Sequence, residues 1–402
     1  MKFAHMADCH IGNWRDPKLR GISTKAFTKA IDICIERNVD FILISGDLFN
    51  TSLPGIDKLK QVVTKLKQLQ NKDMPVYIVP GSHDFSPSGK TMLDVLEEAG
   101  LLINVVKGDI ENNKLKLRFT IDKKTGVKIT GMLGKKGMLE KNYYENLIKD
   151  NLESEEGFKI FMFHTALTEF KPSDLKDMDS SPLSLLPKKF NYYAGGHVHY
   201  VFEKQEEGYG LITYPGPLFP NNFKELEELG RGGFYIYEDG KVKFESVQIV
   251  NHSPIKIECD NKSAQQIEAD LISQIENKEF NNTIVTIRLS GRLTDKPHDI
   301  DFRRIFKMLY DKSAFFVMKN TAALTSKEFE EIKIENSSVE EVEERLIKEH
   351  LGQIKLDGVD VNKEEALTKQ IMTVLNKEKE EGETNPDFDK RLKEELFNIL
   401  KI

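Results

Sequence analysis

The chain has 402 residues, of which 39% are hydrophobic and 31% charged, and its formal net charge is −7. This length is typical of two or three domains, and this composition allows a buried core beneath a charged surface. The acidic balance excludes a generally basic coat for nucleic acid, whereas a local basic or metal-lined groove stays open.

The cysteine content and the hydropathy indicate the compartment. The three cysteines, Cys9, Cys34 and Cys259, are an odd and sparse set, which fits a reducing environment without a disulfide framework. No stretch approaches the roughly 20 apolar residues that span a bilayer, so we expect no membrane association. Met1 leads into a strand-like segment rather than a signal peptide. We therefore expect a cytoplasmic protein.

Strands and helices alternate through the first hundred residues. Continuous apolar runs predict buried strands, and amphipathic stripes predict helices that cover them. In chain order, the expected elements are a strand at 2–7, a helix at 24–37, a strand at 39–45, a helix at 56–70, a strand at 74–79 and a helix at 91–98. This β-α-β order is typical of a layered α/β sheet.

From residue 115 the pattern changes to short strands and hairpins. The expected strands are 115–121, 127–132, 158–163, 190–194, 210–214, 233–237 and 241–250, and we assign them to a second β layer. The fold class that follows for residues 1–250 is α/β (α+β), a two-layered mixed β-sheet sandwich flanked by helices. Residues 239–240, Asp-Gly, are expected to form a hairpin turn.

Beyond residue 250 the chain is expected to form smaller units. A small α+β domain is predicted for 251–335, with strands at 255–259, 283–289 and 314–319 and helices at 264–276 and 302–310. A linker helix follows at 336–358. Residues 359–402 are predicted to form a helix-loop-helix, with amphipathic helices at 363–381 and 386–400.

Five clusters of metal-ligand type each follow a predicted strand. In open α/β sheets ligands bind at the carboxyl ends of the strands, so all five clusters can converge in one cleft. Mixed Asp and His ligands with a bridging carboxylate suit two divalent ions about 3.5–4 Å apart. The clusters are Asp8 with His10, Asp47, Ser82 with His83 and Asp84, His164, and His197 with His199.

Each cluster has a plainer explanation when it is taken alone. A single D-x-H or G-D can be a helix cap or a turn, and an H-x-H can be a pair of satisfied surface histidines. All five clusters occur in this order and at strand ends, and this combination favours a metal site. His5 lies outside the clusters, and we expect it to be a satisfied strand histidine.

The order D-x-H, G-D, G-x-H-D, H and G-H-x-H resembles the calcineurin-like metallophosphoesterases over residues 1–250. Residues 46–51 (GDLFNT), 196–199 (GHVH) and 214–217 (YPGP) are similar to the archaeal-like repair nucleases of the Mre-eleven/SbcD type. Within this resemblance, two residues depart from the pattern. Ser82 stands where relatives usually carry Asn, and Asn50 stands where many archaeal relatives carry His.

The resemblance implies two Mn²⁺ per chain and one residue that contacts the substrate. His83 would act on the scissile phosphate as a general acid or as a stabiliser of developing charge. Asp47 would bridge the two ions. The implied ligands are Asp8, His10, Asp47 and His199 for one ion, and Asp47, Ser82, His164 and His197 for the other.

The resemblance also implies a manganese-dependent DNA nuclease, with exonuclease and single-strand endonuclease activity, that processes double-strand ends in break repair. Its partner would be a coiled-coil ATPase of the Rad-fifty/SbcC type, docked on 359–402. The alternative is that this helical pair folds back on its own chain. Helices 56–70 and 91–98 resemble a homodimerisation bundle, or else they only pack on the sheet.

The domain at 251–335 resembles a capping domain that binds DNA. Basic residues there could contact phosphates, or they could be ordinary solvated surface. They are Lys256, Arg288, Arg292, Arg303 and Arg304. Two other functions stay open, namely a stand-alone phosphodiesterase on small nucleotides, and a mainly structural subunit that bridges DNA ends with a weakened active site.

Overall fold

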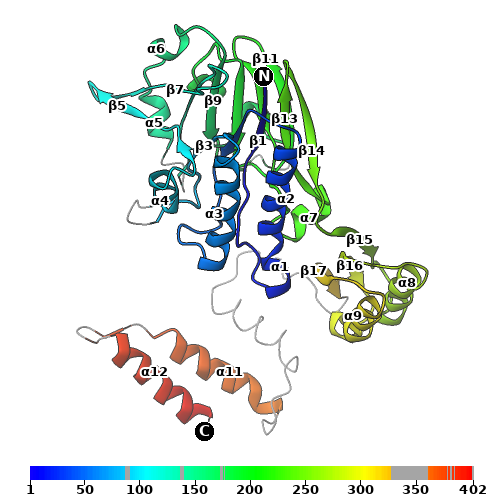
Figure 1. Cartoon of the computed structure of the whole chain (residues 1–402). Helices are drawn as coiled ribbons and strands as arrows, with labels where there is room; N and C mark the ends of the chain where they lie inside the picture. Colours follow the sequence, from blue (N-terminus) through cyan, green and yellow to red (C-terminus); the bar gives the residue numbers. More distant parts are fainter. Residues whose placement is uncertain are drawn as a thin grey trace.

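Two mixed six-stranded sheets form the centre of the computed structural model (Figure 1). The structure describes residues 1–86, 91–135, 140–172, 175, 177–326, 361–377, 379–380, 383 and 385–400. The first sheet has the order β14 (Lys241–Val247), β13 (Gly232–Glu238), β1 (Lys2–Met6), β2 (Phe41–Ser45), β3 (Val76–Val79) and β4 (Ile103–Asn104). The second has the order β11 (Phe202–Glu206), β12 (Gly210–Tyr214), β10 (Tyr192–Gly196), β9 (Lys159–His164), β8 (Lys128–Gly131) and β7 (Thr120–Ile121).

The strands of the first sheet are buried on both faces because side chains alternate along them. On β1, Phe3 belongs to the apolar cluster between the two sheets, whereas Ala4 and Met6 belong to the cluster under the helices. The helices that contribute to this second cluster are α1 (Pro17–Arg20), α2 (Ile22–Glu36), α3 (Ile56–Gln70) and α4 (Met92–Glu98). The expected α/β sandwich flanked by helices is confirmed.

Two features of the predicted second layer were wrong. Segments 233–237 and 241–250 belong to the first sheet, because β13 pairs antiparallel with β1 on the side away from β2. The single strand expected at 115–121 is two strands. β6 (Lys114–Leu117) pairs with β5 (Gly108–Glu111), while β7 pairs with β8. Hydropathy identifies a strand, but it does not identify the neighbour with which the strand pairs.

The outer face of the second sheet carries short elements that the sequence did not indicate. They are α5 (Lys141–Glu145), α6 (Asp150–Glu153) and the 3₁₀ turns Thr168–Phe170 and Leu183–Leu185. A further short helix, α7 (Phe223–Leu229), follows β12. The hairpin turn at Asp239 and Gly240 is as expected, with both residues at positive φ, 49° and 86°.

A separate module follows the two sheets. It has the order β15 (Asn251–Glu258), α8 (Ala264–Glu276), β16 (Thr283–Leu293), α9 (Phe302–Asp311) and β17 (Phe316–Ser326), and it forms one parallel sheet with its own apolar cluster. The expected mixture of strands and helices is present, and the three strands pair in parallel. Its predicted end at 335 and the linker helix at 336–358 lie outside the described residues.

Two helices end the described chain, α11 (Val361–Leu375) and α12 (Asn385–Leu400), and they pack against each other. The first is shorter than the expected 363–381, because its apolar stripe ends at Leu375 and a charged run follows. Across the described residues, no helix is both long and apolar enough to cross a membrane.

The two sheets are joined by a buried polar network around His5, which is the satisfied strand histidine expected from the sequence. Its Nδ1 lies 3.0 Å from the Tyr192 hydroxyl and 3.1 Å from Thr213 Oγ1, and its Nε2 lies 3.0 Å from Ser45 Oγ. Burial lowers the pKa of His5 from 6.5 to about 3. The ring is therefore neutral in the folded protein, and it bridges the sheets without a charge.

Because the pKa of His5 is lowered on folding, its contribution to stability is present above pH 6.5 and is lost as pH falls toward 3. We expect the wild type to lose about 1 kcal/mol more of its unfolding free energy than His5→Gln between pH 7 and 5.5. Urea unfolding at both pH values measures this. His298→Gln is the control, because His298 is 74% exposed. Equal pH dependence of wild type and His5→Gln would contradict the prediction.

Candidate metal centre

The carboxyl ends of five strands meet at one end of the two sheets. β1, β2 and β3 run parallel in the first sheet, and β9 and β10 run parallel in the second. Asp8 and His10 follow β1, and Asp47 follows β2. The remaining candidates are Ser82 and His83 after β3, His164 as the last residue of β9, and His197 and His199 after β10.

Four of these residues have a positive φ angle, a backbone conformation that residues other than glycine rarely adopt. The φ angles are 48° at Asp8, 40° at His10, 51° at Asp47 and 87° at His197. Each such residue costs about 1–3 kcal/mol, and such strain clusters at functional sites. The strand ends therefore turn sharply, and the turn directs each side chain into the shared cleft.

Two glycines let the strands approach closely enough for this. A Cβ on Gly46, which has φ 85°, would lie 2.1 Å from His164 Nδ1. A Cβ on Gly196 would lie 1.9 Å from the carbonyl oxygen of Ser45. A side chain at either position would push the two sheets apart exactly where His164 sits between them. The glycines of the G-D and G-H-x-H motifs are thus required by close packing.

One group of candidate ligands combines residues from both sheets. His10 Nε2 and His199 Nε2 lie 3.2 Å apart. His199 Nε2 is 3.7 Å from Asp8 Oδ1, and His10 Nε2 is 3.7 Å from Asp47 Oδ2. Asp8, His10 and His199 each offer a ligand atom, and these atoms lie within 4.8 Å of one another. The geometry fits the set expected around the first ion.

The second group of candidate ligands lies around the carboxylate of Asp47. His164 Nε2 lies 3.2 Å from Asp47 Oδ2, and its Nδ1 donates to the Ser45 carbonyl oxygen at 2.8 Å. The rings of His164 and His197 are 5.2 Å apart. Asp47, Asp8 and His164 form a further cluster within 4.8 Å. Asp47 thus contacts histidines of both groups, as a bridging ligand must.

The electrostatics suit a divalent cation. Burial would raise the pKa of Asp47, but His164, His10 and the backbone N–H of His83 together hold it well below its usual range. Burial lowers the pKa of His10 and of His197 to about 4, which leaves both rings neutral with a lone pair for a ligand. Among the described residues, the ion-pair partners of Asp47 are histidines rather than Lys or Arg.

Nearby carboxylates raise the pKa values of the other two histidines, His164 and His199. For His164, burial acts to lower the pKa, but Asp47 outweighs it and raises the pKa to about 9. For His199, burial is likewise outweighed by Asp8 and Glu225, and the pKa rises to about 10. His164 Nε2 is buried, and its contact with Asp47 Oδ2 at 3.2 Å is an ion pair without good hydrogen-bond geometry. A cation held by Asp47 and His164 would satisfy that atom.

His83 has a fixed orientation, and with His10 and Asp47 it forms a third group of possible ligand atoms within 4.8 Å of one another. Its Nδ1 donates to the carbonyl oxygen of Asn50 at 2.9 Å, because a carbonyl can only accept. Its ring contacts that of His10 edge to face, with centroids 4.9 Å apart. Its backbone N–H donates to Asp47 Oδ1 at 2.8 Å. The same loop carries Ser82, which is 8% exposed.

Three supporting residues were missed or left without a role by the sequence reasoning. Glu225 on α7 accepts from His199 Nδ1 at 2.9 Å. The Ser45 carbonyl orients His164. Asp84, fully buried, accepts from the backbone N–H groups of Gly81 and Phe49 and so joins two loops of the site. Glu225 lies 26 residues after His199 in an ordinary acidic helix, so the sequence gives no signal for it.

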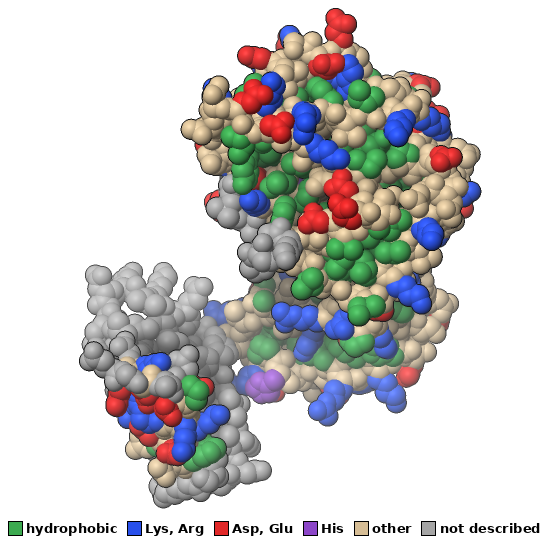
Figure 2. All heavy atoms as spheres, turned by 60° about the vertical axis from the view of Figure 1, so that its left-hand side comes forward, with side chains coloured by type: hydrophobic (Ala, Val, Ile, Leu, Met, Phe, Trp, Pro, Cys, Tyr) green, Lys and Arg blue, Asp and Glu red, His purple; other side chains and the backbone are tan. Residues whose placement is uncertain are grey.

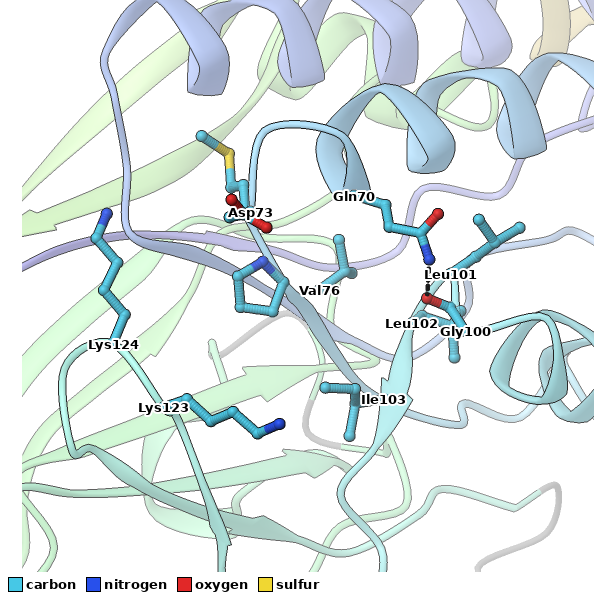
Figure 3. Close-up of a pocket in the computed structure, with 11 residues that line it drawn as sticks. Gln70, Asp73, Val76, Gly100, Leu101, Leu102, Ile103, Lys123 and Lys124 are labelled. Carbon is cyan, nitrogen blue, oxygen red and sulfur yellow. Dashed lines mark hydrogen bonds between the residues drawn. The ribbon is translucent and has the colours of Figure 1, made fainter.

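A cavity of about 460 Å³ lies elsewhere, at the other end of β3 (Figure 3). Val76 and Ile103 line this cavity, and so do Lys123 and Lys124 from the turn before β8. Since the metal-ligand clusters follow the carboxyl ends of the strands, this cavity is separate from them.

The family model for calcineurin-like phosphoesterases matches residues 1–201, which carry all five clusters. This chain belongs to the calcineurin-like phosphoesterase family, as the order of its motifs indicated. Membership implies a site for two metal ions, and the described residues supply the ligand groups for it.

The comparisons with individual proteins extend beyond that family region. The chain is 25% identical to the DNA double-strand break repair protein Mre11 of Archaeoglobus fulgidus, over 89% of this chain and 83% of that protein. It is 27% identical to the Mre11 protein of Methanococcus maripaludis, over 65% of this chain and 68% of that protein. A dimetal phosphatase from Danio rerio aligns at 12% identity with a TM-score of 0.39, covering 61% of this chain and 95% of that one.

We expect His83→Ala to retain the bound metal but to lose activity, because Nδ1 donates to the Asn50 carbonyl oxygen and Nε2 is proposed to act on the substrate. A lost proton donor typically costs about 10²–10⁴-fold in rate. Hydrolysis of bis(p-nitrophenyl) phosphate gives the rate, and native mass spectrometry counts the metal ions. Loss of an ion from His83→Ala would show that His83 is a ligand instead. His298→Ala serves as the control for a distant, exposed histidine.

Proposed function

We propose that this protein is a manganese-dependent DNA nuclease, with exonuclease and single-strand endonuclease activity, that processes DNA ends in double-strand break repair. The observation that carries the proposal is the convergence of Asp and His ligands around Asp47, in a chain similar to archaeal Mre11 proteins over most of its length. Three buried unpaired thiols agree with a reducing, cytoplasmic setting.

In this proposal two Mn²⁺ are held by the expected residues. One ion takes Asp8, His10, Asp47 and His199, and the other takes Asp47, Ser82, His164 and His197. Oxygen and imidazole ligands of this kind suit Mn²⁺. When bound, such a pair of cations neutralises charge on the phosphate and lowers the pKa of a coordinated water.

In the proposed cleavage of the phosphodiester bond, side chains of this protein also have direct roles. Asp47 stays ionised in the folded protein, so it can serve both sets of ligands at once. The hydrogen bond from His83 Nδ1 to the Asn50 carbonyl oxygen leaves Nε2 as the ring nitrogen for the substrate. In its protonated, imidazolium form the ring can donate the Nε2 proton to the leaving oxygen of the broken phosphodiester bond and return to the neutral form. The buried walls hold these groups in place and keep them out of bulk water.

The surface for DNA is proposed to include the module of β15–β17. Figure 2 shows several Lys and Arg side chains on the lower part of that face, at the level where this module lies in Figure 1. Four of the five expected basic residues are exposed, namely Lys256, Arg292, Arg303 and Arg304. The fifth, Arg288, is paired with Glu227, so we remove it from the phosphate contacts.

We also propose a homodimer formed through α3 and α4. Helix α3 was expected either to pack on the sheet or to form a dimer contact. Its residues Val62, Leu66 and Leu69 are buried on the sheet, which supports packing. Its first residue, Ile56, is 85% exposed, which supports a dimer contact. Val95 on α4 is also exposed. These exposed apolar side chains are available for contact with a second copy of the chain.

The decisive test is cleavage of end-labelled duplex, hairpin and single-stranded DNA with Mn²⁺ and then with EDTA. We expect cleavage with Mn²⁺ and none with EDTA. Asp47→Asn, which removes the shared charge, should be inactive. Hydrolysis of cyclic or linear mononucleotides without cleavage of DNA would favour a small-nucleotide phosphodiesterase. DNA binding without any hydrolysis would favour a structural end-bridging subunit.

The helical pair α11–α12 is proposed to dock on a coiled-coil ATPase of the Rad-fifty/SbcC type. Its predicted apolar stripes are half-buried against each other, but Leu375 and Phe397 remain 56% and 51% exposed. Apolar side chains on such a helical surface are suited to a partner groove.

We expect deletion of 359–402 to abolish co-purification with that ATPase and to spare cleavage of short single strands. Phe397→Glu should weaken co-purification in the intact chain, because it places a charge in an apolar contact. Lys390→Glu is the matched control, since Lys390 is 76% exposed. Full-strength co-purification of the deletion variant would refute the docking, whatever the outcome of the cleavage assay.

A further inference from the structure

We propose that helix α7 couples the module of β15–β17 to the metal centre, with Glu225 as a positioning residue for His199; this rests on the metal-ligand role proposed for His199. In Figure 1, α7 lies where the sandwich meets β15. It contacts β16, while Leu226 at its centre is buried in the apolar core under the helices. The helix is therefore fixed between the two parts.

The first link joins Glu225 to His199. A carboxylate can only accept, so His199 Nδ1 carries the proton of the 2.9 Å hydrogen bond to Glu225 Oε1. This leaves Nε2 as the ligand atom, directed at His10 Nε2, 3.2 Å away. A carboxylate behind a metal-binding imidazole fixes both its tautomer and its ring orientation. Glu225 thus determines where His199 can hold a cation.

Glu225 is itself held in place from the metal side. Its Oε2 accepts from the backbone N–H of Asn221 at 2.7 Å. Asn13, which lies three residues after the proposed ligand His10, donates its side-chain N–H to Asn221 Oδ1 at 2.8 Å. The start of α7 is therefore tied to the loop that carries the first ligands.

The second link joins the opposite side of α7 to the module. Arg288 on β16 contacts Glu227 Oε2 through Nε at 2.7 Å and through a terminal nitrogen at 2.6 Å. The Glu227 side chain is only 5% exposed. Arg288 also lies over the ring of Phe223, 5.2 Å from its centroid. Separating this partly buried ion pair would leave the buried Glu227 carboxylate without its partner, so α7 and β16 are held together.

The geometry of a helix explains why one short segment serves both contacts. Successive residues are about 100° apart around the axis, so residues 225 and 227 point to nearly opposite sides. Phe223 and Glu227, four residues apart, share the side that faces Arg288. A tilt of the module against the sandwich is thus passed through α7 to His199, and it changes how strongly the centre holds its metal.

Calorimetric titration of Mn²⁺ into the full-length chain tests the first link. Glu225→Ala should weaken one of the two sites by about 10–100-fold and leave the other unchanged. Glu225→Gln should weaken it less, because its amide oxygen still accepts from Nδ1. Glu228→Ala is the matched control, since it removes a carboxylate from an exposed position of the same helix. Unchanged binding by Glu225→Ala would overturn the positioning role.

The second link, between Arg288 and Glu227, is tested by comparing single and double variants. Arg288→Ala should weaken the same Mn²⁺ site, and it should add nothing in a Glu225→Ala background, because both changes act through His199. Lys307→Ala, at an exposed position of α9 in the same module, should leave binding unchanged. Additive losses, or an unaffected site in Arg288→Ala, would refute the coupling. A wild type that binds no Mn²⁺ would instead refute the proposed function. Circular dichroism confirms that each variant is folded.

Discussion

The buried carboxylate of Asp47 is the group on which the rest of the metal centre depends. It lies 3.2 Å from His164 of the second sheet and 3.7 Å from His10 of the first, and it accepts the backbone N–H of His83. An ionised carboxylate that is 2% exposed is stable only with such compensation. The loops after β1, β2, β3 and β9 are therefore held in one arrangement by a single charge.

The backbone around Asp47 has an unusual conformation that places the candidate ligands near its carboxylate. Asp8, His10 and Asp47 all have positive φ, and the strain at these turns is balanced by the hydrogen bonds and packing of the two sheets. His5, between the same sheets, shows how the sandwich maintains their spacing with a neutral polar network. The sandwich thus sets the positions of the candidate ligands through its own packing.

The site also extends beyond the region matched by the phosphoesterase family, residues 1–201. Glu225 and Arg288 both lie after it, yet one orients His199 and the other fixes the helix that carries Glu225. The module of β15–β17 is therefore attached through the same helix that supports a proposed ligand. In the proposed function, contact with DNA at that module would therefore act on the metal centre through α7.

The sequence by itself predicted most of the longer elements and the candidate ligand residues, because burial periodicity and the motifs at strand ends are local signals. α3 (Ile56–Gln70) and α8 (Ala264–Glu276) end where the pattern indicated. Only the tertiary structure decided that β13 and β14 join β1, that Arg288 is bound to Glu227, and that Glu225 stands behind His199. These are contacts between residues far apart in the chain, and no local pattern specifies which partner a strand edge or a charged side chain will meet.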